Sequence, residues 1–216
     1  MNYLAHLYLS HETPEAITGA MLGDFVKGRV PEHWGPEVRR AIALHRAIDR
    51  YTDSHPAVVA SRALISPERR RFAGILIDVF HDHFLARDWP RYHPRPLAEF
   101  TRTVYRVLLP QRARLPERLR RMLPAMAADD WLASYARVEA VDAALRGIAR
   151  RFRYPERARA LGTAVAELER NYAPLAARFE EFFGDLRSYV AGEGRAVRER
   201  RAAAPAFTRS SSVDRA

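Results

Sequence analysis

The sequence contains no cysteine, which excludes disulfides, thiolate metal sites, iron–sulfur clusters and a cysteine nucleophile. Any metal must therefore be bound by His, Asp or Glu, and the chain has 8 histidines. The 10 glycines are scattered, so there is no Gly-rich loop for a phosphate, and no G-x-S-x-G turn offers a serine nucleophile. These absences direct attention to the histidines and carboxylates.

Long apolar runs are also absent. No stretch approaches the roughly 18 uncharged apolar residues of a membrane span, and the N-terminus lacks the pattern of a secretory signal. We therefore expect a cytoplasmic protein with no membrane partner. A chain of 216 residues, of which 48% are hydrophobic, is long enough for one domain with a substantial core and too short for two large ones.

Acidic residues are fewer than basic ones, 26 against 36, and the net charge is +10. Residues 1–100 hold 13 basic and 12 acidic side chains, residues 101–194 hold 17 and 12, and residues 195–216 hold 6 and 2. Lys27 is the single lysine, so the bias reflects an arginine-rich composition. A basic surface favours an acidic partner. Aromatic residues do not interleave with the arginine clusters as a nucleic-acid platform requires, so no nucleic acid is expected.

Apolar residues recur at three- and four-residue spacing, and no alternating strand pattern is found, which predicts an all-α fold in a single helical domain over residues 1–194. Thr13-Pro14-Glu15 and Ser66-Pro67-Glu68 are typical helix starts. The expected helices span about 14–26, 36–52, 67–86, 97–109, 116–127, 129–150 (broken) and 155–191. Residues 195–216 are rich in Arg, Ala and Ser and are expected to form a disordered tail.

The last predicted helix carries a heptad-like apolar seam, with Pro174 expected to kink it. Two interpretations are open: a long helix packed against its own domain, or a dimeric coiled coil. We favour the first, and with it a monomer, because a seam interrupted by proline rarely forms a coiled coil alone. The seam consists of Leu161, Val165, Leu168, Tyr172, Leu175, Phe179, Phe182 and Leu186.

Polar residues interrupt the apolar faces of three predicted helices. A four-residue spacing stacks such side chains on one side of a helix. They are Asp24 in the first helix, His45, Asp49 and Asp53 in the second, and Asp78, Asp82 and His83 in the third. Each alone is typical of a paired or solvent-facing residue, but several carboxylates in a core cost several kcal/mol per ion, roughly, without a positive partner.

A divalent cation would supply that positive partner, since the matching core positions offer no Lys or Arg. Aspartate oxygens with imidazole nitrogens suit Mn²⁺, Mg²⁺, Fe²⁺ or Zn²⁺. Because carboxylates outnumber imidazoles in the set, Mn²⁺ or Mg²⁺ is expected ahead of Zn²⁺. Such sites are typical of hydrolases in which the metal activates a water and neutralises phosphoryl charge.

Four ordered motifs resemble the acyl carrier protein phosphodiesterase family over roughly residues 1–190. They are residues 2–7 (NYLAHL), 23–28 (GDFVKG), 45–49 (HRAID) with Thr52 and Asp53, and 78–85 (DVFHDHFL). The resemblance implies a helical protein related to the HD-domain metal-dependent phosphohydrolases, with a divalent metal, most often Mn²⁺. It also implies the reaction: removal of the 4′-phosphopantetheine arm from holo acyl carrier protein, leaving the apo protein.

The resemblance also assigns roles, carried over position by position. The metal ligands are expected among Asp24, His45, Asp49, Asp78, Asp82 and His83. His6 and Asp53 are expected to transfer protons, contact phosphate or support the ligands. Because Lys27 and Arg46 each lie near a candidate ligand, and not because of the resemblance, one of them is expected to provide a cation for the charged oxygens. His81 fits less well, and a packing or solvent-facing role is an equal alternative.

Carrier proteins are small and acidic, so a basic docking face is expected. The candidates are Arg39, Arg40, Arg69, Arg70 and Arg71, with an ordinary solvated surface as the alternative. Two rival functions are open: an HD-type phosphohydrolase acting on a nucleotide or cyclic dinucleotide with the same residues, and a basic helical nucleic-acid binder.

Overall fold

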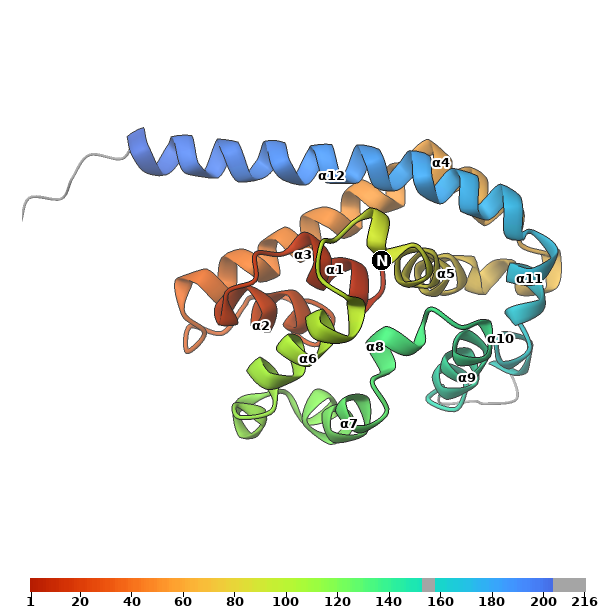
Figure 1. The fold of residues 1–216 in the computed structure, drawn as a ribbon, viewed down its shortest axis with the longest axis horizontal. Coiled ribbons are helices and arrows are strands. Elements are labelled where there is room, and N and C mark those ends of the chain that lie inside the picture. Colours follow the sequence, from red (N-terminus) through yellow and green to blue (C-terminus); the bar gives the residue numbers. More distant parts are fainter. Residues whose placement is uncertain (153–157, 204–216) are drawn as a thin grey trace, which may run out of the picture.

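The computed structural model describes residues 1–152 and 158–203, with side chains up to residue 192. The described part contains helices and no strands, which confirms the predicted all-α class. Figure 1 shows one long C-terminal helix lying across a body of shorter helices. The helices of the first half are α1 (Tyr3–Leu9), α2 (Pro14–Leu22), α3 (Pro36–Ser54), α4 (Pro56–Ala63), the 3₁₀ helix η1 (Pro67–Phe72) and α5 (Ala73–Arg87).

The first helix, α1, was not predicted. It is only 7 residues long and packs against α2 and α5, with Leu4, Ala5 and Leu7 buried. A helix this short has little stability alone, so tertiary packing maintains it. Its burial brings the N-terminal segment into the centre of the domain, beside α5 (Figure 1).

Helices α2 and α3 make the most extensive contact of any two described helices. Thr13 accepts a hydrogen bond from the Ala16 N–H as the predicted N-cap of α2, and Pro14 occupies the first turn. A Cβ on Gly19 would lie 2.4 Å from the Cβ of Ala41, so only glycine permits this helix crossing. Helix α2 ends at Leu22 rather than near residue 26, and the chain then turns toward α3.

The second half is more broken than its periodicity predicts. It comprises η2 (Trp89–Arg91), α6 (Leu97–Leu108), η3 (Arg112–Arg114), α7 (Glu117–Ala128), α8 (Trp131–Ser134), α9 (Val138–Ala149), α10 (Arg159–Gly162), α11 (Val165–Arg170) and α12 (Tyr172–Ala203). The expected break within 129–150 is confirmed as the α8–α9 junction.

The predicted helix over 155–191 is in fact three helices, α10 to α12. Pro174 lies in the first turn of α12, where its missing N–H costs nothing, so it starts a helix instead of kinking one. The seam residues Leu175, Phe179 and Phe182 are buried, and Phe179 packs on Phe84 of α5 with ring centroids 5.7 Å apart. The seam thus packs against its own domain, as the first interpretation expects.

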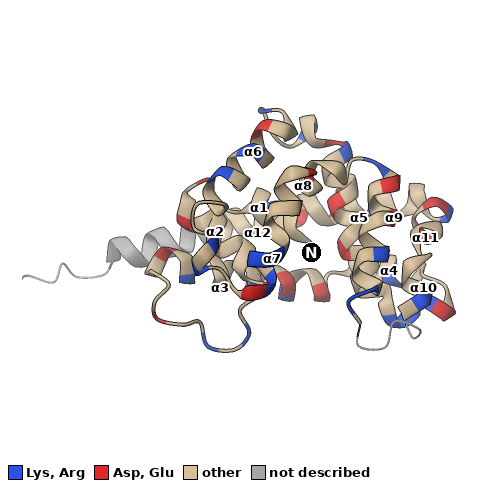
Figure 2. Ribbon diagram, turned by 90° about the horizontal axis from the view of Figure 1, so that it is seen from below, with Lys and Arg blue, Asp and Glu red and all other residues tan. Residues whose placement is uncertain are grey.

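Helix α12 continues beyond residue 194, where the predicted tail begins, to Ala203. The predicted disorder of residues 204–216 lies outside the described residues. No helix in the described part has the length and apolar content needed to cross a membrane. Figure 2 shows basic and acidic positions interspersed along the helices in that view.

Candidate metal centre

Three side chains from two helices meet beside the end of α2. His6 of α1 and His45 and Asp49 of α3 each offer a ligand atom, and these atoms lie within 4.8 Å of one another. Asp24, just after α2, joins them, with its Oδ1 3.8 Å from His45 Nε2. Both imidazoles are buried, whereas the Asp24 and Asp49 side chains are 36% and 40% exposed. The cluster is therefore accessible from the carboxylate side.

His45 is held in one orientation. Its Nδ1 lies 2.7 Å from the Ala20 carbonyl oxygen, to which it donates a hydrogen bond, so Nε2 faces the cluster. A second hydrogen bond that fixes the tautomer and ring direction is typical of metal-bound histidines. The ring packs directly on Gly23, where a Cβ would lie 2.1 Å from His45 Cγ. The glycine in the Gly23-Asp24 pair is therefore required for His45 to reach its position.

His6 stacks on His45, with ring centroids 3.5 Å apart and planes inclined by 7°. Its Nε2 lies 3.0 Å from Asp49 Oδ1, yet neither ring nitrogen forms a well-oriented hydrogen bond within the described part of the chain. His45 Nε2 also forms no well-oriented hydrogen bond within the described residues, although it lies 3.4 Å from Asp49 Oδ2. A neutral imidazole has one nitrogen with a free lone pair, so His6 through one ring nitrogen, and His45 through Nε2 once it is deprotonated, can each offer one lone pair to a metal.

The charges of the cluster fit this role. Burial lowers the pKa of His6 to about 4, so this imidazole is neutral at neutral pH. Burial also opposes charge on His45, but Asp24 and Asp49 outweigh it and raise its pKa to about 9. Burial likewise disfavours charge on Asp24 and Asp49, yet the contact with His45 lowers the pKa of both carboxyls. The two acids are thus ionised.

Asp78 lies beside this cluster. Its Oδ1 is 3.1 Å from the ammonium group of Met1, which is also 3.4 Å from Asp49 Oδ1. Burial raises the Asp78 pKa against the opposing effect of the ammonium group. A positive group therefore compensates these acids in part, although no Lys or Arg in the sequence indicated one.

Asp82 and His83 are not brought into the cluster. Asp82 is fully buried, and its two oxygens accept hydrogen bonds from the backbone N–H groups of Leu4 and Ala5, at 2.8 and 3.0 Å. It thus satisfies the N-terminus of α1. His83 points the other way: Nδ1 donates to the Tyr135 carbonyl, and Nε2 accepts from the Tyr172 hydroxyl, both at 2.8 Å.

The structure also places the remaining polar candidates. Asp53 is 69% exposed and pairs with Arg62 of α4 at 2.5 Å, away from the cluster. Arg46 donates to the Val26 carbonyl at 2.8 Å and thereby supports the turn that carries Asp24. Lys27 is exposed on that same turn.

His81 is buried against aromatic rings of α12. Its ring centroid lies 5.0 Å from that of Phe182. This is the packing alternative considered for this residue.

The five arginines considered for docking differ in their contacts. Arg39 and Arg40 are exposed on α3, where Arg40 pairs with Glu37. Arg69 is mostly buried and donates to Glu167 and the Ala160 carbonyl, both at 3.1 Å, so its contacts belong to the fold.

Arg70 and Arg71 also make local contacts. Arg70 donates to the Ile65 carbonyl at 3.1 Å. Arg71 lies over the Phe72 ring, 4.6 Å from its centroid. These residues are in the 3₁₀ helix η1, and not in the first turn of an α-helix as predicted.

His6 lies within the candidate metal cluster, whereas the sequence predicts a supporting position for it. The available signal was the apolar segment around it, Leu4-Ala5-His6-Leu7, in which a histidine is enclosed by residues that all become buried.

The comparisons with known proteins agree with the resemblance. The family described as acyl carrier protein phosphodiesterase matches residues 1–186. The chain belongs to this family. A relative named acyl carrier protein phosphodiesterase from Serratia proteamaculans is 38% identical over 187 residues, covering 86% of this chain and 95% of the relative. Relatives of the same name from Escherichia coli O6:H1 and Enterobacter sp. are 36% and 34% identical, each covering 85% of this chain and 94% of the relative.

The match to the acyl carrier protein phosphodiesterase family runs from α1 into the first half of α12, and it therefore includes every residue of the cluster. No solved structure matches the chain significantly. This makes the chain a phosphodiesterase hydrolase by family.

Proposed function

We propose that this protein removes the 4′-phosphopantetheine arm from holo acyl carrier protein by metal-dependent hydrolysis. The site of the reaction is the cluster of His6, Asp24, His45 and Asp49. Family membership supports the substrate, since the relatives carry that name. The observation that carries the metal site is His45: its Nδ1 is bonded to the Ala20 carbonyl while its buried Nε2 faces two carboxylates and has no hydrogen bond.

The donor set fits a divalent cation. Two imidazoles and two ionised carboxylates provide nitrogen and oxygen ligands within reach of one another. The chemistry that such a cation supplies when bound is a lower pKa for a coordinated water and compensation of charge on phosphoryl oxygens. The half-exposed Asp24 and Asp49 leave one side of the cluster open to a phosphodiester carried by another protein.

The structure changes the argument about which metal is bound. From the sequence, Mn²⁺ or Mg²⁺ is expected ahead of Zn²⁺ because carboxylates outnumber imidazoles, but the assembled cluster has equal numbers of each. Imidazole ligands suit Mn²⁺, Fe²⁺ and Zn²⁺ better than Mg²⁺, which prefers oxygen ligands and retains several waters. We propose Mn²⁺, with Fe²⁺ and Zn²⁺ as competitors. The relation to HD-domain phosphohydrolases stays a prediction.

Residues of the chain other than the ligands have defined tasks in this proposal. Gly23 and the Ala20 carbonyl position His45. Arg46 fixes the turn that carries Asp24, and Lys27, exposed on that turn, is the cation proposed to contact phosphoryl oxygens.

The test combines metal analysis with a carrier-protein assay. Protein purified without chelator is analysed for metal, then incubated with holo carrier protein and Mn²⁺, and loss of the arm is followed by mass spectrometry. Asp49→Ala and His45→Ala should abolish metal binding and turnover while retaining helical content. Asp53→Ala is the matched control, because it removes an acid one turn further along α3 that is exposed and outside the cluster.

Several results would contradict the proposal. Turnover that survives in both cluster variants at limiting Mn²⁺ would show that the metal is not held there. Release of product from a nucleotide or cyclic dinucleotide, with holo carrier protein left intact, would favour the rival phosphohydrolase.

A further inference from the structure

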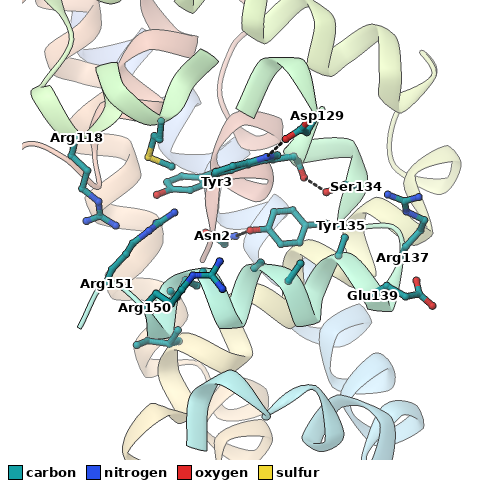
Figure 3. Close-up of a pocket in the computed structure, with 18 residues that line it drawn as sticks. Asn2, Tyr3, Arg118, Asp129, Ser134, Tyr135, Arg137, Glu139, Arg150 and Arg151 are labelled. Atoms are coloured by element: carbon teal, nitrogen blue, oxygen red, sulfur yellow. Dashed lines mark hydrogen bonds between the residues drawn. The ribbon is translucent and has the colours of Figure 1, made fainter. Parts of the chain in front are cut away.

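A second feature of the fold is a large cavity next to the cluster. It has a volume of about 980 Å³ and lies between α1, α7, α8 and α9, with Ile75 of α5 in its wall. Ligand cavities in proteins measure roughly 300–1,000 Å³. Figure 3 shows its lining, with Arg118, Arg150 and Arg151 at one end and Arg137 and Glu139 at the other.

The arginine end of the cavity adjoins the metal cluster. Tyr3 lines the cavity and stacks on Phe25, the neighbour of Asp24, with ring centroids 6.1 Å apart. Burial, together with the charge of Asp24, raises the pKa of Tyr3 to about 12, while the charges of Arg118 and Arg151 lower it, so all three charges act on this hydroxyl. Figure 3 shows the Tyr3 ring beside these two arginines.

A second connection runs along α5. Ile75 lines the cavity, and Asp78, which contacts the Met1 ammonium group, lies three residues later. Residues three apart lie on the same face of a helix. Asp78 therefore lies about one helical turn along α5 from the cavity wall.

The cationic end is available to an anion. Arg118, Arg150 and Arg151 form no ion pair with a carboxylate of the described residues, and Arg118 lies over the Phe25 ring, 5.6 Å from its centroid. A planar guanidinium contacts phosphate through paired N–H donors. These arginines are not among the candidates from sequence, because they line one cavity with Tyr3 only when distant segments of the chain pack together.

The other walls are suited to an uncharged chain. Ala140, Ala144 and Ile148 of α9 provide apolar lining, and Trp131 of α8 also lines the cavity. The Tyr135 hydroxyl accepts a hydrogen bond from Asn2 at 2.9 Å, and its own proton has no acceptor in the described part of the chain. It can donate to a carbonyl in the cavity.

We propose that this cavity binds the 4′-phosphopantetheine arm, with Arg118 and Arg151 contacting its phosphate and the α9 wall contacting its amide-containing chain. This inference rests on the proposed function, and it specifies the part of the protein that holds the arm during the reaction. An arm with one anionic end and a long uncharged remainder matches a cavity with one cationic end beside the cluster and apolar walls beyond it.

Binding of the released arm tests the proposal directly. Calorimetric titration with 4′-phosphopantetheine, and in parallel with pantetheine, which lacks the phosphate, is performed on the full chain. The double variant Arg118→Gln with Arg151→Gln should weaken binding of 4′-phosphopantetheine about tenfold or more and leave pantetheine binding nearly unchanged. Arg121→Gln, which removes an exposed arginine of α7 outside the cavity, is the matched control.

A second variant fills the cavity without disturbing the fold. Gly147 lines the cavity, and a Cβ there would meet only Arg150 Nη2 at 3.9 Å. Gly147→Leu should weaken binding of both ligands because its side chain occupies the cavity. Gly147→Ala is the control: it also raises helix propensity relative to glycine, but it leaves most of the cavity volume free and should bind both ligands nearly as well as the unsubstituted protein. Thermal melts should show that both variants are at least as stable as the unsubstituted protein.

The outcomes separate this inference from the proposed function. Equal affinities for 4′-phosphopantetheine in the unsubstituted, double-arginine and Gly147→Leu proteins, or no measurable binding to the unsubstituted protein, would overturn the inference even if holo carrier protein is cleaved. The proposed function fails instead if the unsubstituted protein with Mn²⁺ leaves holo carrier protein intact. Weakened binding of the phosphorylated ligand in the double variant, with the control unchanged, would support the cavity.

Discussion

Replacing Asp82 should damage the fold more than the proposed metal site. Its two oxygens accept hydrogen bonds from the Leu4 and Ala5 N–H groups in a fully buried position. Asp82→Ala leaves both donors without a partner, at about 1–3 kcal/mol each, so we expect a loss of about 2–6 kcal/mol. Domains of this size are stable by roughly 5–15 kcal/mol, so this is a large fraction of the total. Asp82→Asn keeps one acceptor oxygen and should cost about half as much.

The pH dependence gives a second measure of the same contact. Burial raises the Asp82 pKa to about 7, above its value in the unfolded chain, so this group favours folding at low pH and loses that contribution as the pH rises through 7. Asn does not titrate. The stability difference between Asp82→Asn and the unsubstituted protein should therefore be larger near pH 5 than near pH 8.

The assay is urea denaturation followed by far-UV circular dichroism, without metal. Asp53→Ala is the control, since an exposed ion pair contributes about 1 kcal/mol or less. If Asp82→Ala unfolds at the same urea concentration as the unsubstituted protein and loses only Mn²⁺ binding, then Asp82 is a metal ligand and its assigned role at α1 is refuted.

Four further predictions concern the cluster and its surroundings. Gly23→Ala places a Cβ 2.1 Å from His45 Cγ and should lower Mn²⁺ affinity about 10- to 100-fold in a chelator competition; unchanged affinity would contradict it. His45 must lose a proton before it can bind metal, and its pKa is about 9. Mn²⁺ affinity should therefore increase about tenfold for each unit by which the pH is raised, up to about pH 9. A pH-independent affinity would remove His45 from the ligands. Arg39→Glu with Arg40→Glu should raise KM for holo carrier protein and weaken its salt dependence. Unchanged kinetics would show that these two arginines form an ordinary solvated surface and take no part in docking. Truncation after Gly194 should leave turnover within a few-fold, and a large loss at constant helical content would assign the tail a role in binding.

Helix starts and the all-α class are determined locally, so the sequence predicts them. Thr13 and Pro14 fix the start of α2 through a cap hydrogen bond and a preset backbone angle, which depend on neighbours in the chain. The four-residue spacing of His45 and Asp49 likewise places them on one side of α3 wherever that helix packs. The resemblance to the family, confirmed by the comparison, rests on such local motifs.

The lengths of helices in the second half are not determined in this way. A heptad seam over 155–191 is consistent with one helix, yet the chain divides into α10, α11 and α12. Periodicity reports which side of a helix is apolar, but where a helix ends depends on where its neighbours leave room. Pro174 is compatible with both arrangements, as a kink or as a first-turn residue.

The membership of the candidate metal cluster is decided by tertiary structure. By spacing alone, Asp82 and His83 are as good candidates as His45 and Asp49. The packing of α1 against α5 directs Asp82 to backbone N–H groups, and the same packing inserts His6 beside His45. A carboxylate or imidazole on a buried face can be satisfied by a metal, a backbone donor or another side chain. Which of these it meets depends on residues far along the chain, and their approach is fixed only when the helices pack.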